Sequence, residues 1–135
     1  MDFLSPEEKM LEKEFLSQGF IVRDVANIES LKKIQKFAID MLSKKGCDSL
    51  NKAHENISVS QLNDFRLDVI KEINAQAWLK EAYYKIAKPY LNILVGNELA
   101  MQSRVNLSIQ LPEDDSSLLP VHADTWSGDS AFEVV

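Results

Sequence analysis

Apolar side chains recur at helical spacing in the first part of the chain. The run Ser5-Pro6-Glu7-Glu8 combines an N-cap serine, a proline at the first helical position and a glutamate that completes a capping box. We therefore expect a helix that begins after Ser5, continues to about Gln18 and ends at Gly19, a residue suited to a left-handed C-cap. The apolar residues 20–22 that follow predict a short strand.

Three further helices are predicted from the same 3.6-residue spacing. Their expected limits are 27 or 30 to 46, 60 to 74, and 78 to about 89. Asn27 and Ser30 are alternative N-caps for the first of them, and Gly46 closes it. Pro89 is expected to end or kink the last one. Residues 47–56 lose the periodicity and predict a surface loop.

After residue 96 the apolar period changes from helical to alternating. Four apolar side chains alternate with four polar ones over residues 104–111, RVNLSIQL, which predicts a strand with one apolar and one polar face. The polar face either lines a binding site or is solvated, as in most antiparallel sheets. Residues 112–117 form an acidic turn. Because helices precede strands, the expected fold class is α+β.

Composition narrows the setting of the chain. With 135 residues, 45% hydrophobic and 27% charged, it fits one globular domain, residues 1–135. A net charge of -6 argues against nucleic-acid and anionic-membrane partners, which select concentrated Lys and Arg. Cys47 is the single cysteine, so no disulfide framework is expected. The acidic amino terminus lacks a signal-peptide layout, and we expect a cytoplasmic protein with no membrane span.

The most distinctive chemistry lies in residues 118–126, LLPVHADTW. On extended backbone His122 and Asp124 point to the same side, with Trp126 beside them. On a helix their side chains would diverge by about 200°. An imidazole and a carboxylate supply two of the three protein ligands of the facial triad that holds non-haem Fe(II). The alternative is an ordinary hydrogen-bonded or solvated polar pair.

Three strings together carry a family resemblance: residues 106–110 (NLSIQ), 121–129 (VHADTWSGD) and 132–135 (FEVV). The sequence resembles the Fe(II)/2-oxoglutarate-dependent dioxygenases, and among them the phytanoyl-CoA hydroxylase-like branch. Within that branch, the three strings are similar to those of oxygenases encoded in sporadic carbohydrate-biosynthesis clusters. The resemblance implies a helical N-terminal layer followed by part of a double-stranded β-helix, the jelly-roll or cupin-like core. It also implies Fe(II) and 2-oxoglutarate as cofactors and a carbohydrate or polysaccharide precursor as substrate.

The resemblance also implies roles for individual residues. His122 and Asp124 are the metal ligands, Asn106 and Gln110 are candidates for co-substrate contacts, and Trp126 is a candidate for substrate binding. The family's third ligand, a distal histidine, and its basic 2-oxoglutarate anchor lie downstream of His-X-Asp. We therefore expect an incomplete oxygenase, mainly helical over residues 1–96, with the first core strands in 97–135.

Other residues and other functions remain open from the sequence. His54 is interpreted as a surface histidine or a contact at the mouth of the site, because it precedes the motif. Four aromatic residues either form core or line a sugar site: Trp78, Tyr83, Tyr84 and Tyr90. The rival function is a non-catalytic truncated module that self-associates, or binds a partner, through an exposed sheet edge. A cupin-like sugar epimerase is disfavoured because no His-X-His is present.

Overall fold

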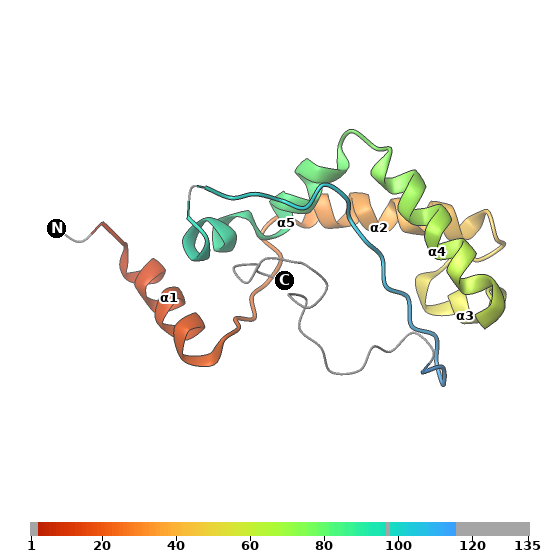
Figure 1. Ribbon diagram of the computed structural model, residues 1–135, viewed down its shortest axis with the longest axis horizontal. Helices are drawn as coiled ribbons and strands as arrows, with labels where there is room; N and C mark the ends of the chain where they lie inside the picture. The colour runs from red at the N-terminus through yellow and green to blue at the C-terminus, as the bar shows by residue number, and fades with distance from the viewer. Residues whose placement is uncertain (1–2, 97, 116–135) are drawn as a thin grey trace. The chain divides into compact units, whose positions relative to one another are not determined.

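The computed structural model describes residues 3–96 and 98–115 (Figure 1). The helices of this part of the chain are α1 (Pro6–Gln18), α2 (Ile28–Ser43), the 3-10 turn η1 (Leu50–Lys52), α3 (Ala53–Asn56), α4 (Val59–Asn74) and α5 (Leu79–Leu94). The chain divides into two compact units. The first holds Met1–Phe37 and Gln76–Ser103, and the second holds Ala38–Ala75 and the chain from Arg104 onward.

In the first unit, α1 has the termini predicted from its sequence. The backbone N–H of Glu8 donates to Ser5 Oγ at 3.2 Å, and the backbone N–H of Ser5 donates to Glu8 Oε2 at 2.7 Å, which completes the capping box. The bond from Ser5 holds the pKa of Glu8 below its ordinary value. Gly19 ends the helix with φ 79°, where any side chain would be strained.

The strand predicted for residues 20–22 is wrong, because the connection from α1 to α2 has no regular structure. Phe20 and Val22 are exposed. The connection is instead attached to α5 by two hydrogen bonds, from the Ala26 N–H to the Ile86 carbonyl at 2.9 Å and from the Tyr90 hydroxyl to the Asp24 carbonyl at 3.1 Å. These two bonds, one from the backbone and one from a side chain, hold the connection in place of strand pairing.

Pro89 was expected to end or kink α5, and of these alternatives the ending is wrong, because the chain remains helical through Pro89 to Leu94. A proline inside a helix donates no backbone hydrogen bond and crowds the preceding turn. One carbonyl of that turn, that of Ile86, accepts the hydrogen bond from Ala26. The carbonyl that Pro89 leaves without its helical donor is that of Lys85, so the Ala26 bond attaches the α1–α2 connection to α5 and does not replace the missing bond.

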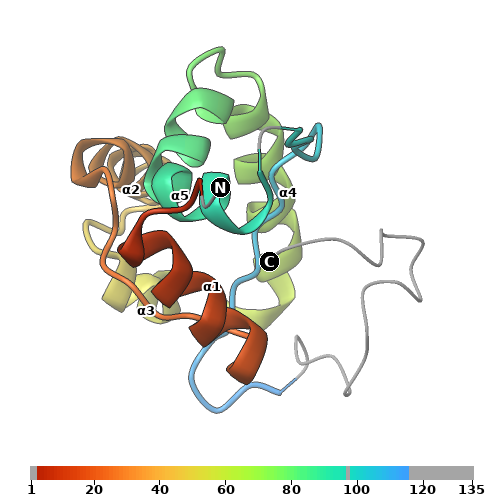
Figure 2. The same ribbon diagram turned by 90° about the vertical axis from the view of Figure 1, so that its left-hand side faces the viewer.

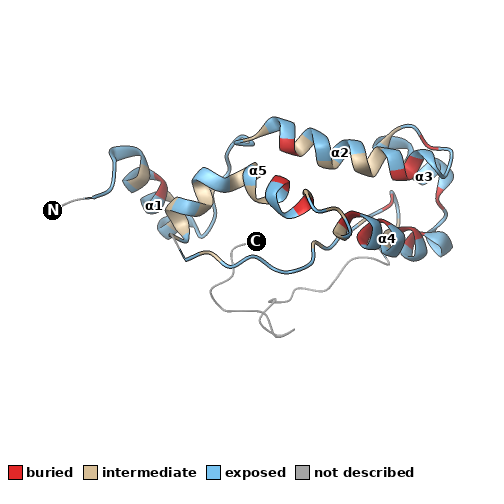
Figure 3. Cartoon of the chain, turned by 90° about the horizontal axis from the view of Figure 1, so that it is seen from above, coloured by how far each residue is buried: buried red, intermediate tan, exposed pale blue. Residues whose placement is uncertain are grey.

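In the second unit, α4 buries one face, which Figure 3 shows as red positions along the helix. Its buried residues are Leu62, Phe65, Val69, Ile70 and Ile73. Cys47 is 1% exposed, and its S–H donates to the Ser49 carbonyl at 3.0 Å. The loop predicted for residues 47–56 is wrong in part, since η1 and α3 form within it.

The expected α+β fold with a β-helix core is contradicted, because residues 3–96 and 98–115 contain helices, turns and irregular chain but no β-strand. A strand requires a neighbouring backbone, and no other extended segment pairs with residues 104–111 in this range. The expected strands at 118–126 and 132–135 lie outside the described residues. Within the described ranges, no helix has the length and apolarity that crossing a bilayer requires.

The ion pair between Glu14 and Arg23 predicts a pH dependence of the first unit. Two guanidinium nitrogens of Arg23 contact the two carboxylate oxygens of Glu14, and these hydrogen bonds lower the pKa of Glu14. A lowered pKa stabilises the fold above the ordinary glutamate pKa of about 4.3, and this contribution is lost as the pH falls through the lowered pKa. We expect Glu14→Gln to lose less stability than wild type on acidification below about pH 4, measured by thermal melting followed by circular dichroism.

The control for this measurement is Glu12→Gln, an exposed glutamate on the same helix. It should keep the acid sensitivity of the wild type. Equal acid sensitivity of Glu14→Gln and wild type would contradict the assigned role of the ion pair.

Candidate functional site

The predicted alternation of residues 105–111 is present in the structure. This segment lies beside α4 in both Figure 1 and Figure 2. Val105, Leu107 and Ile109 are partly buried and Leu111 is 7% exposed. The three even-numbered residues between them are exposed. The period-two pattern therefore gave the correct buried face, although the segment is not part of a sheet.

Asn74, at the end of α4, supplies the main polar attachment of this segment. Its side-chain Nδ2 donates to the Val105 carbonyl at 2.8 Å, and its Oδ1 accepts from the Val105 N–H at 2.9 Å. Nδ2 also donates to the Ile70 carbonyl inside α4 at 2.7 Å. A side-chain amide carries one acceptor and two donors, so it can make the same pair of bonds as a neighbouring strand. Asn74 thus takes the place of a strand at Val105.

Arg66 supplies a second attachment two residues along the segment. Its Nη1 donates to the Leu107 carbonyl at 3.4 Å, and its Nη2 donates to Asn63 Oδ1 at 3.1 Å. In extended backbone, the N–H and C=O of alternate residues point to the same edge. Val105 and Leu107 therefore both direct their backbone polar groups to the edge served by α4.

The two co-substrate candidates from the sequence lie on the outer face of this segment. Asn106 and Gln110 are exposed, and Ser108 lies between them on the same face. Their amide groups offer both donors and acceptors to a ligand. The face is polar, as the alternation predicted, and of the two alternatives left open for it the described residues show an exposed face.

The proposed metal ligands His122 and Asp124, together with Trp126, lie outside the described residues. Within the described ranges, no group of three or more His, Cys, Asp or Glu side chains is arranged to hold a metal ion. His54 is exposed on the short helix α3, in agreement with its interpretation as a surface histidine. The iron site thus stays a prediction from sequence.

Three of the four aromatic residues singled out from the sequence make contacts within the first unit, and the fourth, Tyr83, is 49% exposed. Trp78 packs edge-on against Phe37, with ring centroids 6.1 Å apart, and Lys33 Nζ lies 4.5 Å from the Trp78 ring centroid. The Tyr84 hydroxyl donates to Asn92 Oδ1 at 2.7 Å, and Tyr90 bonds the α1–α2 connection. These three rings serve packing and tethering within the first unit, and the sugar-site alternative stays a prediction.

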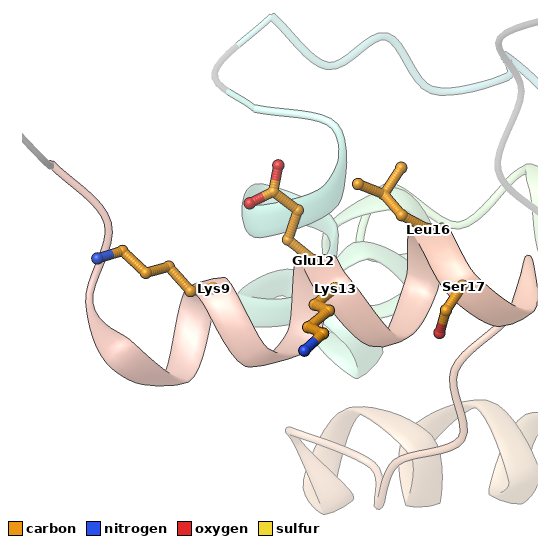
Figure 4. A pocket seen from close by; sticks show the side chains of 5 residues that line it. All are labelled: Lys9, Glu12, Lys13, Leu16 and Ser17. Carbon is orange, nitrogen blue, oxygen red and sulfur yellow. The ribbon is translucent and has the colours of Figure 1, made fainter.

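A shallow hollow on α1 is the remaining candidate, and Figure 4 shows its side chains. All of the lining residues belong to this one helix: Lys9, Glu12, Lys13, Leu16 and Ser17. Glu12 and Leu16 point to one side and Lys13 and Ser17 to the other, so their polar atoms do not converge (Figure 4). A ligand site needs polar groups that meet at one point, and this surface has none.

A scan against protein-family models and searches of curated proteins and of solved structures found no match to this chain. The functional argument therefore rests on its own residues.

Sequence reasoning missed Asn74 and Arg66, the residues that position the segment. They lie 31 and 41 positions from their partners Val105 and Leu107. Asparagine at the end of a helix is also a common cap residue, so its identity gave no sign of a distant partner. The only indication in the sequence was the position of Asn74 at a helix end, earlier in the chain than an alternating segment.

Removal of the Asn74 side chain tests this attachment. We expect Asn74→Ala to lower the free energy of unfolding by about 1–3 kcal/mol, because two backbone groups of Val105 lose their partners. The measurement is urea unfolding, combined with amide hydrogen exchange at Val105. Asn51→Ala is the matched control, since Asn51 is an exposed asparagine of the same unit whose side chain bonds none of the described residues. Equal losses in the two variants would show that the Asn74 bonds are not decisive.

Proposed function

We propose that this chain supplies His122 and Asp124 to the Fe(II) centre of a non-haem, 2-oxoglutarate-dependent dioxygenase, a hydroxylase of a carbohydrate or polysaccharide precursor. The observation that supports the proposal is the sequence of residues 121–129, VHADTWSGD. The proposal rests on the chemistry of these side chains and does not depend on a β-helix core.

The donor set fits the metal. A neutral imidazole and a carboxylate, completed by a second histidine, form the facial triad typical of non-haem Fe(II) oxygenases, with open positions opposite the protein ligands. His54 is the only other histidine of the sequence. Because the resembling family takes its second histidine from a position downstream of His-X-Asp, the proposal assigns the third position to a ligand from outside this sequence.

Each residue of the proposed site has a distinct task. When bound, the metal supplies the activation of dioxygen. Asp124 offsets part of the metal charge, and neutral His122 binds without adding charge. Trp126 is assigned to contact substrate. The amides of Asn106 and Gln110 are assigned to the co-substrate, because an amide N–H can donate to the carboxylate oxygens of 2-oxoglutarate. The exposed positions of these two residues are compatible with ligand contact.

Charge and composition define the setting that we propose for this activity. A net charge of -6 disfavours nucleic acid and anionic lipid as partners, and a single buried cysteine fits a reducing compartment. The proposal therefore places the reaction in the cytoplasm, on a small-molecule or carbohydrate substrate.

A second candidate function is a non-catalytic association module. One specific observation favours it: the outer backbone edge of residues 106–110 makes no hydrogen bond with any described residue. The sequence predicted that association would use the exposed edge of a sheet. In the described residues the edge belongs instead to a single extended segment.

The dioxygenase proposal is tested by anaerobic titration of the chain with Fe(II) in the presence of 2-oxoglutarate. Bidentate binding of 2-oxoglutarate to Fe(II) gives a weak visible charge-transfer band. We expect this band with the wild type and its loss in His122→Ala, since removal of one of two protein ligands weakens metal binding by roughly tenfold or more. Asp124→Ala should behave as His122→Ala.

His54→Ala is the matched control, because it removes the other histidine of the chain from an exposed position. It should keep the band. Absence of the band from the folded wild type, or equal loss in His54→Ala and His122→Ala, would refute the assignment of the iron ligands.

A further inference from the structure

Hydrogen bonds from the described part of the chain reach residues 105–111 at one of their two backbone edges. Val105 and Leu107 direct their polar groups toward Asn74 and Arg66 of α4. Because backbone direction alternates along extended chain, Asn106, Ser108 and Gln110 direct theirs to the opposite edge. No hydrogen bond from the described residues reaches these N–H and C=O groups. Among the described residues, this outer edge is a row of backbone donors and acceptors without partners.

The outer edge also lacks the features that usually prevent strand addition. Exposed edges are commonly protected by charged side chains, proline or bulges. Between Arg104 and Pro112 the segment contains neither a charged residue nor proline nor glycine. Helix α4 reaches the segment from the other edge, through Asn74 and Arg66, and so leaves this one open. An added strand would meet no obstacle from α4.

We propose that the outer edge of residues 105–111 pairs with the same edge of a second copy of this chain, as an antiparallel two-stranded ribbon across a two-fold axis at Ser108. An isologous contact of this kind closes after two copies. It is distinct from the dioxygenase proposal, since it uses backbone groups and leaves the Asn106 and Gln110 side chains on the polar face.

The alternation of the segment fits this register. With Ser108 opposite Ser108, Asn106 faces Gln110, and each of these facing pairs exchanges both backbone hydrogen bonds. Directly opposed residues point to the same face, so Val105 lies opposite Leu111 and Leu107 opposite Ile109. The apolar face of one copy is thereby continuous with the apolar face of the other copy. A shift by one residue would set polar against apolar side chains.

Charge at the two ends of the segment favours a second copy in antiparallel orientation as the occupant. Arg104 precedes the segment, and the exposed residues Glu113 and Asp115 follow it. In an antiparallel pair, each Arg104 comes beside the acidic end of the other copy, whereas a parallel pair would stack like charges at both ends. The segment is thus complementary to itself only when reversed.

The test is sedimentation equilibrium of the intact chain over a range of concentrations. We expect a reversible monomer–dimer equilibrium, with the amides of Asn106, Ser108 and Gln110 protected from hydrogen exchange more strongly as the dimer forms. Ser108→Pro removes the N–H on the axis and should weaken dimerisation roughly tenfold or more. Ser108→Ala keeps that N–H and should dimerise as wild type.

A charge exchange tests the orientation without altering the backbone. R104E makes both ends of the segment acidic, and the double variant E113K/D115K makes both ends basic. Each variant alone should dimerise more weakly than wild type, and an equimolar mixture should regain the dimer.

The opposite results would overturn the proposal. A monomer at every concentration excludes the ribbon. Protection of the Ser108 amide that does not change with concentration shows instead that the chain covers its own edge. Equal dimerisation of Ser108→Pro and Ser108→Ala places any dimer elsewhere on the molecule.

Discussion

The side-chain amide of Asn74 makes hydrogen bonds with both backbone polar groups of Val105. In a sheet these groups would bond a neighbouring strand. Extended chain cannot satisfy its own N–H and C=O groups, so a segment beside a helix depends on side chains for this purpose. Asn74 does so at Val105, and Arg66 contributes at Leu107. Because these bonds hold one backbone edge of the segment, they also fix the direction of the odd-numbered side chains, which lie on its more buried face.

The features that sequence predicted well are those determined by neighbouring residues. Ser5, Glu8 and Gly19 define α1 through bonds and backbone angles that span a few positions, and the structure confirms them. Asn27 was one of two alternative caps, and its Oδ1 accepts from the Ser30 N–H at 2.8 Å. Such caps are formed by residues a few positions apart, so distant contacts have little effect on where the helix begins.

The wrong predictions concern features that depend on distant partners. Alternation in residues 104–111 reports that one face is buried, and it carries no information about whether the neighbour is a strand or a helix. Pro89 has a local tendency to end a helix, but α5 continues to Leu94, because such a tendency is a weak signal that tertiary context overrides. The α+β assignment failed for the first of these reasons.

The candidate site divides in the same way. The exposed polar face that carries Asn106 and Gln110 was predicted from alternation. The pairing of His122 with Asp124 follows from their spacing alone and stays a prediction. For Trp78, spacing left both core and sugar site open, and its tertiary contacts with Phe37 and Lys33 identify it as a packing residue.

Because Cys47 is buried, the rate at which its thiol reacts reports local opening of the second unit. The thiol is 1% exposed, and the sequence contains no other cysteine. A thiol reagent in solution can therefore react only when the chain around Cys47 opens, and the modification rate measures how often that happens. The first unit contributes no thiol to this signal. The two units can thus be compared in one sample, with Cys47 labelling for the second and hydrogen exchange for the first.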